Sequence, residues 1–305
     1  MEIKKLKDTM PVPLSAEVRY KDMGNIKEVM FSARKSEGGF ITKLDKERYI
    51  DNRTGEIKEF NHIENRSQDI SNVRKSMALG RDVINTNVKD VRFCRWLTLT
   101  YAENMQDGKK LYFDFMNFVK RARSIYGHFE YITCAEPQSR GAWHLHVLLI
   151  FDHVAPFMPN EVVANLWKKG FVTIKALENK DNSVDNVGAY LTAYLCDVEL
   201  EEFKKEYPNM DIGEIKEIEF KDENGENKNK KYVKGGRLWR YPPGFHIFRY
   251  SKGIKNPEVS EMTYFEAKEK IGSAKPTYSQ TILLNDKVSG FSNTITKEYY
   301  NVLRK

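Results

Sequence analysis

The chain has 305 residues, of which 40% are hydrophobic and 30% charged, and its formal net charge is +7. This length can bury a sizeable core, enough for one catalytic domain with flanking additions. No run approaches the roughly 18 apolar residues that a membrane span needs, and no secretory signal opens the sequence. The cysteines, Cys94, Cys134 and Cys196, lack paired spacing, which is typical of a reduced cytoplasm. We therefore expect a cytoplasmic protein and exclude membrane-spanning and disulfide-rich secreted classes.

The first part of the chain, residues 1–90, reads as an N-terminal extension. Residues 1–60 are polar and mixed in charge, and turn signals interrupt them, so no element is predicted there. Residues 64–87 favour a helix. Basic side chains of this helix are candidates for contacts with duplex origin DNA: Arg66, Arg74, Lys75 and Arg81.

Hydrophobic periodicity and turn signals predict a mixed series of elements after this extension. In chain order they are a strand at 93–101, a helix at 110–125, strands at 128–136 and 143–151, a helix at 160–169, a strand at 171–177 and a helix at 184–198. Adjacent antiparallel strands with interleaved helices indicate an α+β sandwich, in which one sheet packs on helices.

The strand at 143–151 carries the most informative pattern in the sequence. His144 and His146 flank a single leucine within this otherwise apolar run. Side chains alternate across a strand, so both imidazoles point to the same face. Two nitrogen ligands on one face make half of a metal site. A pair of structural histidines remains the plainer interpretation of this motif alone.

A carboxylate upstream strengthens the metal interpretation. Glu136 ends the preceding predicted strand, and residues 137–141 (PQSRG) are typical of a turn. A hairpin built in this way brings the carboxylate beside the imidazoles of His144 and His146. One oxygen and two nitrogens suit a divalent ion that keeps open positions for water or substrate oxygens.

The last predicted helix carries two tyrosines at i and i+4, Tyr190 and Tyr194, with Ser183 as a plausible N-cap. Its apolar stripe centres near Leu191 and Val198. Tyr194 lies about 60° from that centre and Tyr190 about 100°, at roughly 100° of rotation per residue. Tyr194 is therefore expected to pack, and the hydroxyl of Tyr190 is freer to reach a ligand. Aromatic residues at a core edge would give the same pattern.

Residues 227–257 contain nine Lys or Arg, no acidic residue and six interleaved aromatic residues. Basic groups neutralise phosphates and flat rings stack on unpaired bases, so the segment is a candidate track for single-stranded DNA. A solvated basic hairpin with core-facing rings is the alternative. By contrast, residues 197–223 hold eleven acids against four bases, and we expect them to face solvent or to dock a basic surface.

Together these patterns resemble a known family, the HUH endonucleases (U marks a bulky apolar residue), and specifically the rolling-circle replication initiators of plasmids and bacteriophages. Three motifs stand in the family's order. Residues 96–100 (WLTLT) are similar to the first, a strand beside the active site. Residues 136–146 (EPQSRGAWHLH) are similar to the second, which supplies metal ligands, and residues 188–195 (GAYLTAYL) to the third, which supplies nucleophilic tyrosine. The resemblance covers about residues 92–200, with a weaker echo through 237–257.

The sequence departs from the family pattern at two positions. The third motif is usually Tyr-x-x-Lys, whereas the lysine position is Ala193 here. A proline often precedes the first histidine of the second motif, whereas this chain has Trp143, which could add a base-stacking surface.

The resemblance implies both the chemistry and the partners. Mg²⁺ or Mn²⁺ held by Glu136, His144 and His146 would polarise the scissile phosphate. Tyr190, which aligns with the first position of Tyr-x-x-Lys, would attack in line and keep the 5′ phosphate, and Tyr194 could act as a second nucleophile when the strand is rejoined. The freed 3′-OH would prime a host polymerase, so the implied partners are single-stranded and origin DNA, a host helicase and DNA polymerase. The candidate DNA-binding residues are Arg140, Trp143, Lys230, Lys231, Lys234, Arg237, Trp239 and Arg240.

This interpretation divides the chain into the extension at 1–90, a catalytic core at 91–200 and a DNA-binding C-terminal region at 201–305. Three alternatives remain. A conjugative relaxase shares the chemistry, but its tyrosine usually precedes the histidine motif. A tyrosine transposase has the tyrosine last, as here. A binding protein that recognises an origin without cutting it would explain Ala193.

Overall fold

The chain forms two compact units, one built from Met1–Glu64 with Pro257–Lys305 and the other from Asn65–Asn256. These units are cut differently from the three ranges expected from the sequence, because strands near the N-terminus pair with strands near the C-terminus. The computed structural model describes residues 2–6, 8–35, 38–177, 186–192, 197–206, 208, 214–221, 227–287 and 290–304.

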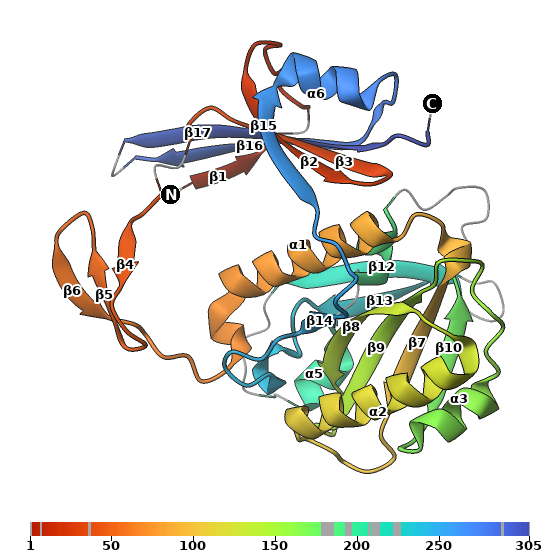
Figure 1. Ribbon diagram of the computed structural model, residues 1–305. Helices are drawn as coiled ribbons and strands as arrows, with labels where there is room; N and C mark the ends of the chain where they lie inside the picture. The colour runs from red at the N-terminus through yellow and green to blue at the C-terminus, as the bar shows by residue number, and fades with distance from the viewer. Residues whose placement is uncertain are drawn as a thin grey trace. The chain divides into compact units, whose positions relative to one another are not determined.

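The unit built from both ends of the chain contains a six-stranded antiparallel sheet in the order β1-β16-β17-β3-β2-β15 (Figure 1). The helix α6 (Tyr264–Ile271) packs on this sheet and begins with a capping box between Thr263 and Glu266. A small three-stranded sheet, β4-β5-β6, completes the unit. Its strands are β1 (Glu2–Lys5), β2 (Glu17–Met23), β3 (Ile26–Ser32), β4 (Ile41–Lys43), β5 (Arg48–Asp51), β6 (Glu56–Glu59), β15 (Glu258–Thr263), β16 (Pro276–Asp286) and β17 (Phe291–Asn301).

The other unit contains a five-stranded sheet in the order β10-β7-β9-β8-β14. The strand with both histidines, β9, is central, as the predicted fold requires. All described pairings in this sheet are antiparallel. Its strands are β7 (Cys94–Thr100), β8 (Glu130–Pro137), β9 (Trp143–Ile150), β10 (Val172–Ala176) and β14 (Phe248–Tyr250).

Two helices, α2 (Gly108–Tyr126) and α3 (Asn160–Trp167), cover one face of this sheet (Figure 1). The carboxylate of Asp107 caps the start of α2 by accepting from two backbone N–H groups. The apolar stripe predicted for α2 is buried against the odd-numbered residues of β9, Leu145, Val147 and Leu149. Each such fully buried large side chain contributes roughly 1.5–3 kcal/mol. The predicted α+β sandwich is confirmed.

The opposite face of the sheet carries α1 (Ile70–Asn87) and α4 (Val187–Thr192). A short 3₁₀ turn, η1 (Arg66–Asp69), leads into α1. Val83 and Ile84 of α1 and Leu191 of α4 form one apolar cluster with sheet residues that include Leu148 of β9. Because Leu148 shares its face with His144 and His146, α1 and α4 lie on the histidine face.

The helix predicted at 184–198 is shorter in the structure, where α4 ends at Thr192 and Val198 already belongs to strand β11 (Val198–Glu199). Val198 matches the helical period by coincidence, because it packs with Phe203 and Val233 in a separate cluster. Asn186 takes the capping role expected of Ser183, and its Oδ1 accepts from the N–H of Ala189 at 2.7 Å. Ser183 itself lies outside the described residues.

A third small sheet, in the order β11-β13-β12, completes this unit. Its remaining elements are η2 (Val91–Phe93), α5 (Leu200–Glu206), β12 (Ile215–Lys221), β13 (Asn227–Val233) and η4 (Leu238–Arg240). Within the described parts of the chain, no helix has both the length and the apolar character that crossing a membrane requires.

Candidate metal centre and its surroundings

The hairpin of β8 and β9 brings the predicted carboxylate and imidazoles together. Glu136 lies directly opposite His144 in the antiparallel register, so the two side chains share a face. The intervening turn closes through a 2.8 Å hydrogen bond from Gly141 N–H to the Gln138 carbonyl. Gly141 has a φ of +87°, a backbone conformation that L side chains rarely adopt. The turn therefore sets the register that aligns the cluster.

Three side-chain atoms converge in this cluster. Oε2 of Glu136 lies 2.8 Å from Nε2 of His144 and 3.0 Å from Nε2 of His146, and the two Nε2 atoms are 3.1 Å apart. The side chains are nearly buried, at 7% exposure for Glu136, 12% for His144 and 17% for His146. Such a set can be held by hydrogen bonds to an ionised carboxylate, or it can hold a metal ion.

The spacing of the three atoms discriminates between metal geometries. Neighbouring ligands in an octahedral site lie about 3 Å apart when each is about 2.1 Å from the ion. In a tetrahedral zinc site the corresponding separation is about 3.4 Å. The observed separations of 2.8, 3.0 and 3.1 Å therefore fit three ligands on one face of an octahedron. The residues fit a divalent cation such as Mg²⁺ or Mn²⁺, with the remaining positions left to water or substrate.

The electrostatics of the cluster also suit a cation. Burial opposes ionisation of Glu136, but hydrogen bonds from His144 and His146 and the charge of Arg237 hold the pKa of the carboxyl well below its usual range. Burial lowers the pKa of His144 against the opposing influence of Glu136. At neutral pH the cluster thus offers a carboxylate and a neutral imidazole, the forms that bind metals.

Neighbouring side chains orient the cluster. Thr98 Oγ1 lies 3.2 Å from Nδ1 of His146, and the Trp96 ring stacks on the same imidazole with ring centroids 5.6 Å apart. These contacts fix the ring so that Nε2 faces Glu136. Residues 96–100 were predicted to form a strand beside this site, and β7 pairs with β9 through them. Within the described part of the chain, Nδ1 of His144 has no hydrogen-bond partner.

Arg237 has a different role in the structure from the DNA contact expected of it. Its Nε lies 3.4 Å from Oε1 of Glu136 and donates to the carbonyl of Asp197 at 3.2 Å, and its Nη1 donates to the carbonyl of Pro137 at 3.1 Å. The guanidinium therefore holds the carboxylate oxygen that points away from the histidines. Sequence reasoning missed this partner, because 101 residues separate Arg237 from Glu136 and no local pattern links them.

The tyrosine motif is placed only in part. Tyr190 belongs to α4, which lies on the histidine face of the sheet. Two contacts dock α4 on α1: Asn85 Nδ2 donates to Asn186 Oδ1 at 2.8 Å, and the N–H of Gly188 donates to Asn85 Oδ1 at 2.8 Å. A Cβ at Gly188 would lie only 2.3 Å from a backbone oxygen of α1, so only glycine fits there. The side chain of Tyr190 and the whole of Tyr194 lie outside the described residues.

The aromatic residues of segment 227–257 divide between core and surface. Tyr241 is fully buried, and its hydroxyl donates to the Ala135 carbonyl at 2.8 Å. Phe245 stacks on Trp143 with ring centroids 4.4 Å apart. Trp143 is 3% exposed and its Nε1 donates to the Gln106 carbonyl, so its ring is not available to stack on a base. That expectation is wrong, because Phe245 already occupies the ring face.

The remaining DNA-contact candidates also have protein partners. Lys230 pairs with Glu199 at 3.3 Å and Lys234 with Glu214 at 3.1 Å. The basic strand β13 pairs along its length with the acidic strand β12, so the acidic segment docks a basic surface of the chain itself. Arg140 donates to the carbonyls of Ala102 and Tyr101. Three candidates are exposed or partly exposed to solvent: Lys231, Trp239 and Arg240.

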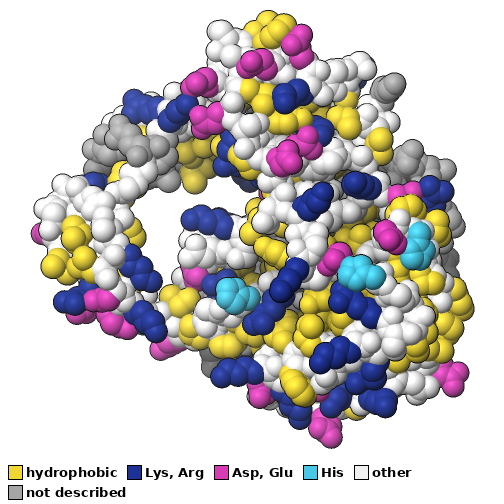
Figure 2. All heavy atoms as spheres, viewed as in Figure 1, with side chains coloured by type: hydrophobic (Ala, Val, Ile, Leu, Met, Phe, Trp, Pro, Cys, Tyr) yellow, Lys and Arg dark blue, Asp and Glu magenta, His cyan; other side chains and the backbone are white. Residues whose placement is uncertain are grey.

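The surface of this unit mixes charge and hydrophobicity. In the view of Figure 2, Lys and Arg side chains are spread over the face that carries α2, between exposed hydrophobic side chains. Phe113, Met116 and Ile125 of α2 are among these exposed hydrophobic residues. The positive charge is thus distributed over the surface as well as along segment 227–257.

The fold and the site together define an α+β protein with a carboxylate and two histidines clustered on the central hairpin of its sheet. A family model for replication-associated proteins of the ORF2 type matches residues 94–199. The matched part runs from β7 to β11 and contains the whole cluster and α4. Comparisons with curated proteins and with solved structures gave no match. The similarity to replication-associated proteins supports a role in the initiation of DNA replication and an interaction with DNA.

Proposed function

We propose that the chain is a rolling-circle replication initiator that nicks single-stranded origin DNA and rejoins it. The observation that carries this proposal is the convergence of Glu136, His144 and His146 on the sheet face that also bears α4, the helix of Tyr190. The match to replication-associated proteins over the same residues favours an initiator over a relaxase or a transposase.

In the proposed reaction, the hydroxyl oxygen of Tyr190 attacks the scissile phosphorus, and the bond from phosphorus to the 3′ oxygen breaks. The leaving oxygen takes up a proton and becomes a free 3′-OH, while the 5′ phosphate stays on the tyrosine. Attack by a 3′-OH on this phosphotyrosine reverses the step, so rejoining needs no external energy source. A host polymerase would extend the 3′-OH, and a host helicase would separate the strands.

The residues of the cluster would hold one Mg²⁺ or Mn²⁺, which when bound polarises the phosphate and offsets charge in the transition state. Glu136 and the two histidines supply the ligand atoms, and Arg237 keeps the free carboxylate oxygen turned away from them. A phenol has a pKa near 10, so a tyrosine nucleophile needs help to lose its proton at neutral pH.

The proposal is tested with end-labelled single-stranded oligonucleotides that tile the DNA around the gene. Incubation with Mn²⁺ should yield one discrete nick and an equimolar covalent protein–DNA adduct on the 5′ side of the break. EDTA should prevent both products. A protein that binds one oligonucleotide tightly and never cuts it would instead be a non-cutting origin-binding protein.

Arg237→Lys should weaken Mn²⁺ binding about tenfold, within the range measured for partners of metal ligands. Lysine keeps the positive charge but cannot bond Glu136, Pro137 and Asp197 at once, so the carboxylate loses its fixed orientation. Isothermal titration with Mn²⁺ measures the change, and Arg240→Lys, three residues along the chain, is the matched control. Equal affinities for the wild type and Arg237→Lys would contradict the orienting role.

Neutralising the lysines of β13 and of the turn after it should weaken binding to single-stranded DNA. Each phosphate that the protein no longer neutralises reduces the slope of log K against log salt by about 0.7. We expect most of the effect of Lys230→Gln, Lys231→Gln and Lys234→Gln to come from Lys231, because Lys230 and Lys234 already pair with acids. Trp239→Ala should weaken binding by about 1–3 kcal/mol if a base stacks there.

The control for these charge changes is a triple variant in the other unit, Lys4→Gln, Lys5→Gln and Lys46→Gln, whose lysines are all exposed. Fluorescence anisotropy between low and high salt gives the slope for each protein. Identical slopes for the two triple variants would exclude β13 as a DNA track.

A further inference from the structure

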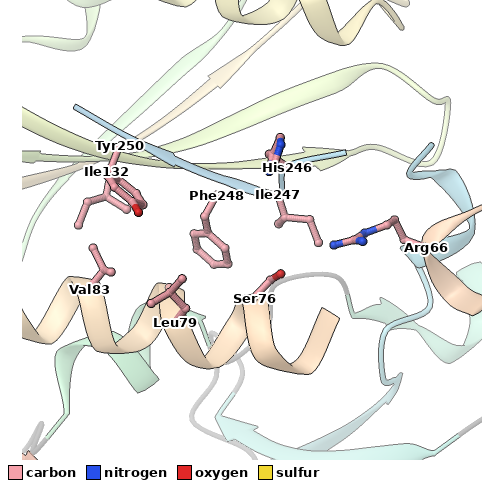
Figure 3. A pocket seen from close by; sticks show the side chains of 10 residues that line it. Arg66, Ser76, Leu79, Val83, Ile132, His246, Ile247, Phe248 and Tyr250 are labelled. Carbon is pink, nitrogen blue, oxygen red and sulfur yellow. The ribbon is translucent and has the colours of Figure 1, made fainter. Parts of the chain in front are cut away.

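A small cavity lies between α1 and the edge strand β14, apart from the metal cluster (Figure 3). Its volume is about 180 Å³, well below the roughly 300–1,000 Å³ of pockets that enclose drug-sized ligands. Val83, Ile132 and Phe248 make its walls apolar, and Arg66 and Ser76 lie at one end. The cavity therefore suits one flat apolar group with a polar edge.

The cavity is on the same face of the sheet as the metal cluster. Phe248 lies opposite Cys134 in β8, which lies opposite His146 in β9, and directly opposed residues share a face. The neighbouring Ile247 accepts a 2.9 Å hydrogen bond from the N–H of Ala135, the residue before Glu136. One DNA strand crossing this face would therefore pass both features.

Arg66 supplies an unusual polar group to this cavity. Its side chain is 10% exposed, and its Nη1 donates to Asp69 Oδ2 at 3.0 Å. Its Nε is buried and has no hydrogen-bond partner in the described part of the chain. Figure 3 shows the guanidinium pointing from η1 towards Ile247, into the cavity. A buried donor without an acceptor is costly, so a ligand that offers acceptor atoms here would be favoured.

We propose that this cavity binds one unpaired guanine base of single-stranded DNA, with O6 and N7 accepting hydrogen bonds from Arg66. The inference rests on the proposed DNA substrate and adds a base-specific subsite to it. The apolar walls contact the ring faces, and the guanidinium reads two adjacent acceptors, the commonest specific contact between arginine and a base. Adenine places an amino donor beside N7, which would oppose the donors of Arg66.

Selection from a random 20-nucleotide single-stranded library tests the subsite without knowledge of the origin. The wild type should enrich guanine at one fixed position of the bound sequence. Arg66→Met, which keeps an apolar stem and removes the donors, should lose this enrichment. Arg74→Met is the matched control, because Arg74 is an exposed arginine on α1. It should bind all sequences more weakly and keep the guanine preference.

A change on the DNA side covers the case in which Arg66→Met fails to fold. With the wild-type protein, 7-deazaguanine at the selected position lacks N7 and should bind roughly 5- to 150-fold more weakly than guanine. Inosine keeps O6 and N7 and should bind as guanine does. Both measurements use the intact chain and an oligonucleotide of the selected sequence.

Enrichment of another base, no enrichment at any position, equal affinity for 7-deazaguanine, or unchanged preference in a folded Arg66→Met would each overturn the subsite. Nicking of the selected sequence is measured in parallel. A guanine preference without any nicking would refute the proposed function and leave the subsite standing. Nicking without a guanine preference would do the reverse.

Discussion

Replacing both His144 and His146 with alanine should lower nicking of single-stranded DNA by at least about 1,000-fold, since metal-assisted charge stabilisation is worth several kcal/mol. Most of the affinity for DNA should remain, because phosphate contacts come largely from Lys and Arg. The double variant should also lose tight Mn²⁺ binding, whereas the wild type, once inhibited by EDTA, should recover activity with added Mn²⁺. Gel assays with end-labelled DNA and isothermal titration measure the two effects.

The matched control for the histidine pair is the double variant His128→Ala and His153→Ala. Both of these histidines are exposed, and each pairs with a neighbouring carboxylate, Glu130 or Asp152. This control should nick at the wild-type rate. Full nicking by the protein without His144 and His146 would remove the cluster from the mechanism, even if the adduct assay still detects a covalent complex.

Tyr190→Phe should eliminate the covalent protein–DNA adduct altogether. Phenylalanine keeps the aromatic ring and removes only the oxygen that would attack the phosphate. Tyr194→Phe should still nick, and it should lose strand closure if Tyr194 is the second nucleophile. Peptide mass spectrometry of the adduct identifies the labelled residue directly.

Tyr278→Phe, an exposed tyrosine in the other unit, provides the control and should form the adduct normally. Label on Tyr194 alone would reverse the assignment of the initiating tyrosine. An adduct on neither tyrosine would refute the covalent mechanism. Because Tyr190→Phe retains the metal ligands, its affinity for Mn²⁺ should equal that of the wild type, which separates loss of the nucleophile from loss of the site.

The parts of the site that are local in sequence could be predicted from it. The alternation of β9 placed His144 and His146 on one face, and the turn at 137–141 brought Glu136 to them. The apolar stripe of α2 was equally readable, because helical periodicity repeats over nineteen residues. Each of these inferences needs only the period of one element or the closure of one hairpin.

Contacts between distant segments could not be predicted in this way. The position of Trp143 in the sequence suggested a stacking surface for DNA, but Phe245 covers its ring. The sequence of 1–60 indicated no element, yet its strands are paired with residues near 258–301, where their partners complete the sheet. Isolated strands of mixed charge carry little periodic signal, since cross-strand packing with a remote partner is what stabilises them.

The nesting of one unit inside the other has a consequence for biosynthesis. Asn65–Asn256 is complete before the ribosome reaches β15, so the unit with the metal cluster can fold while the chain is still being made. The strands β1, β2 and β3 emerge first, but β1 and β3 must wait for β16 and β17. At about 5–20 residues per second, that wait lasts on the order of ten seconds to a minute. Premature termination near residue 256 would therefore release an intact sheet with its cluster, joined to N-terminal strands whose hydrogen-bonding edges remain open.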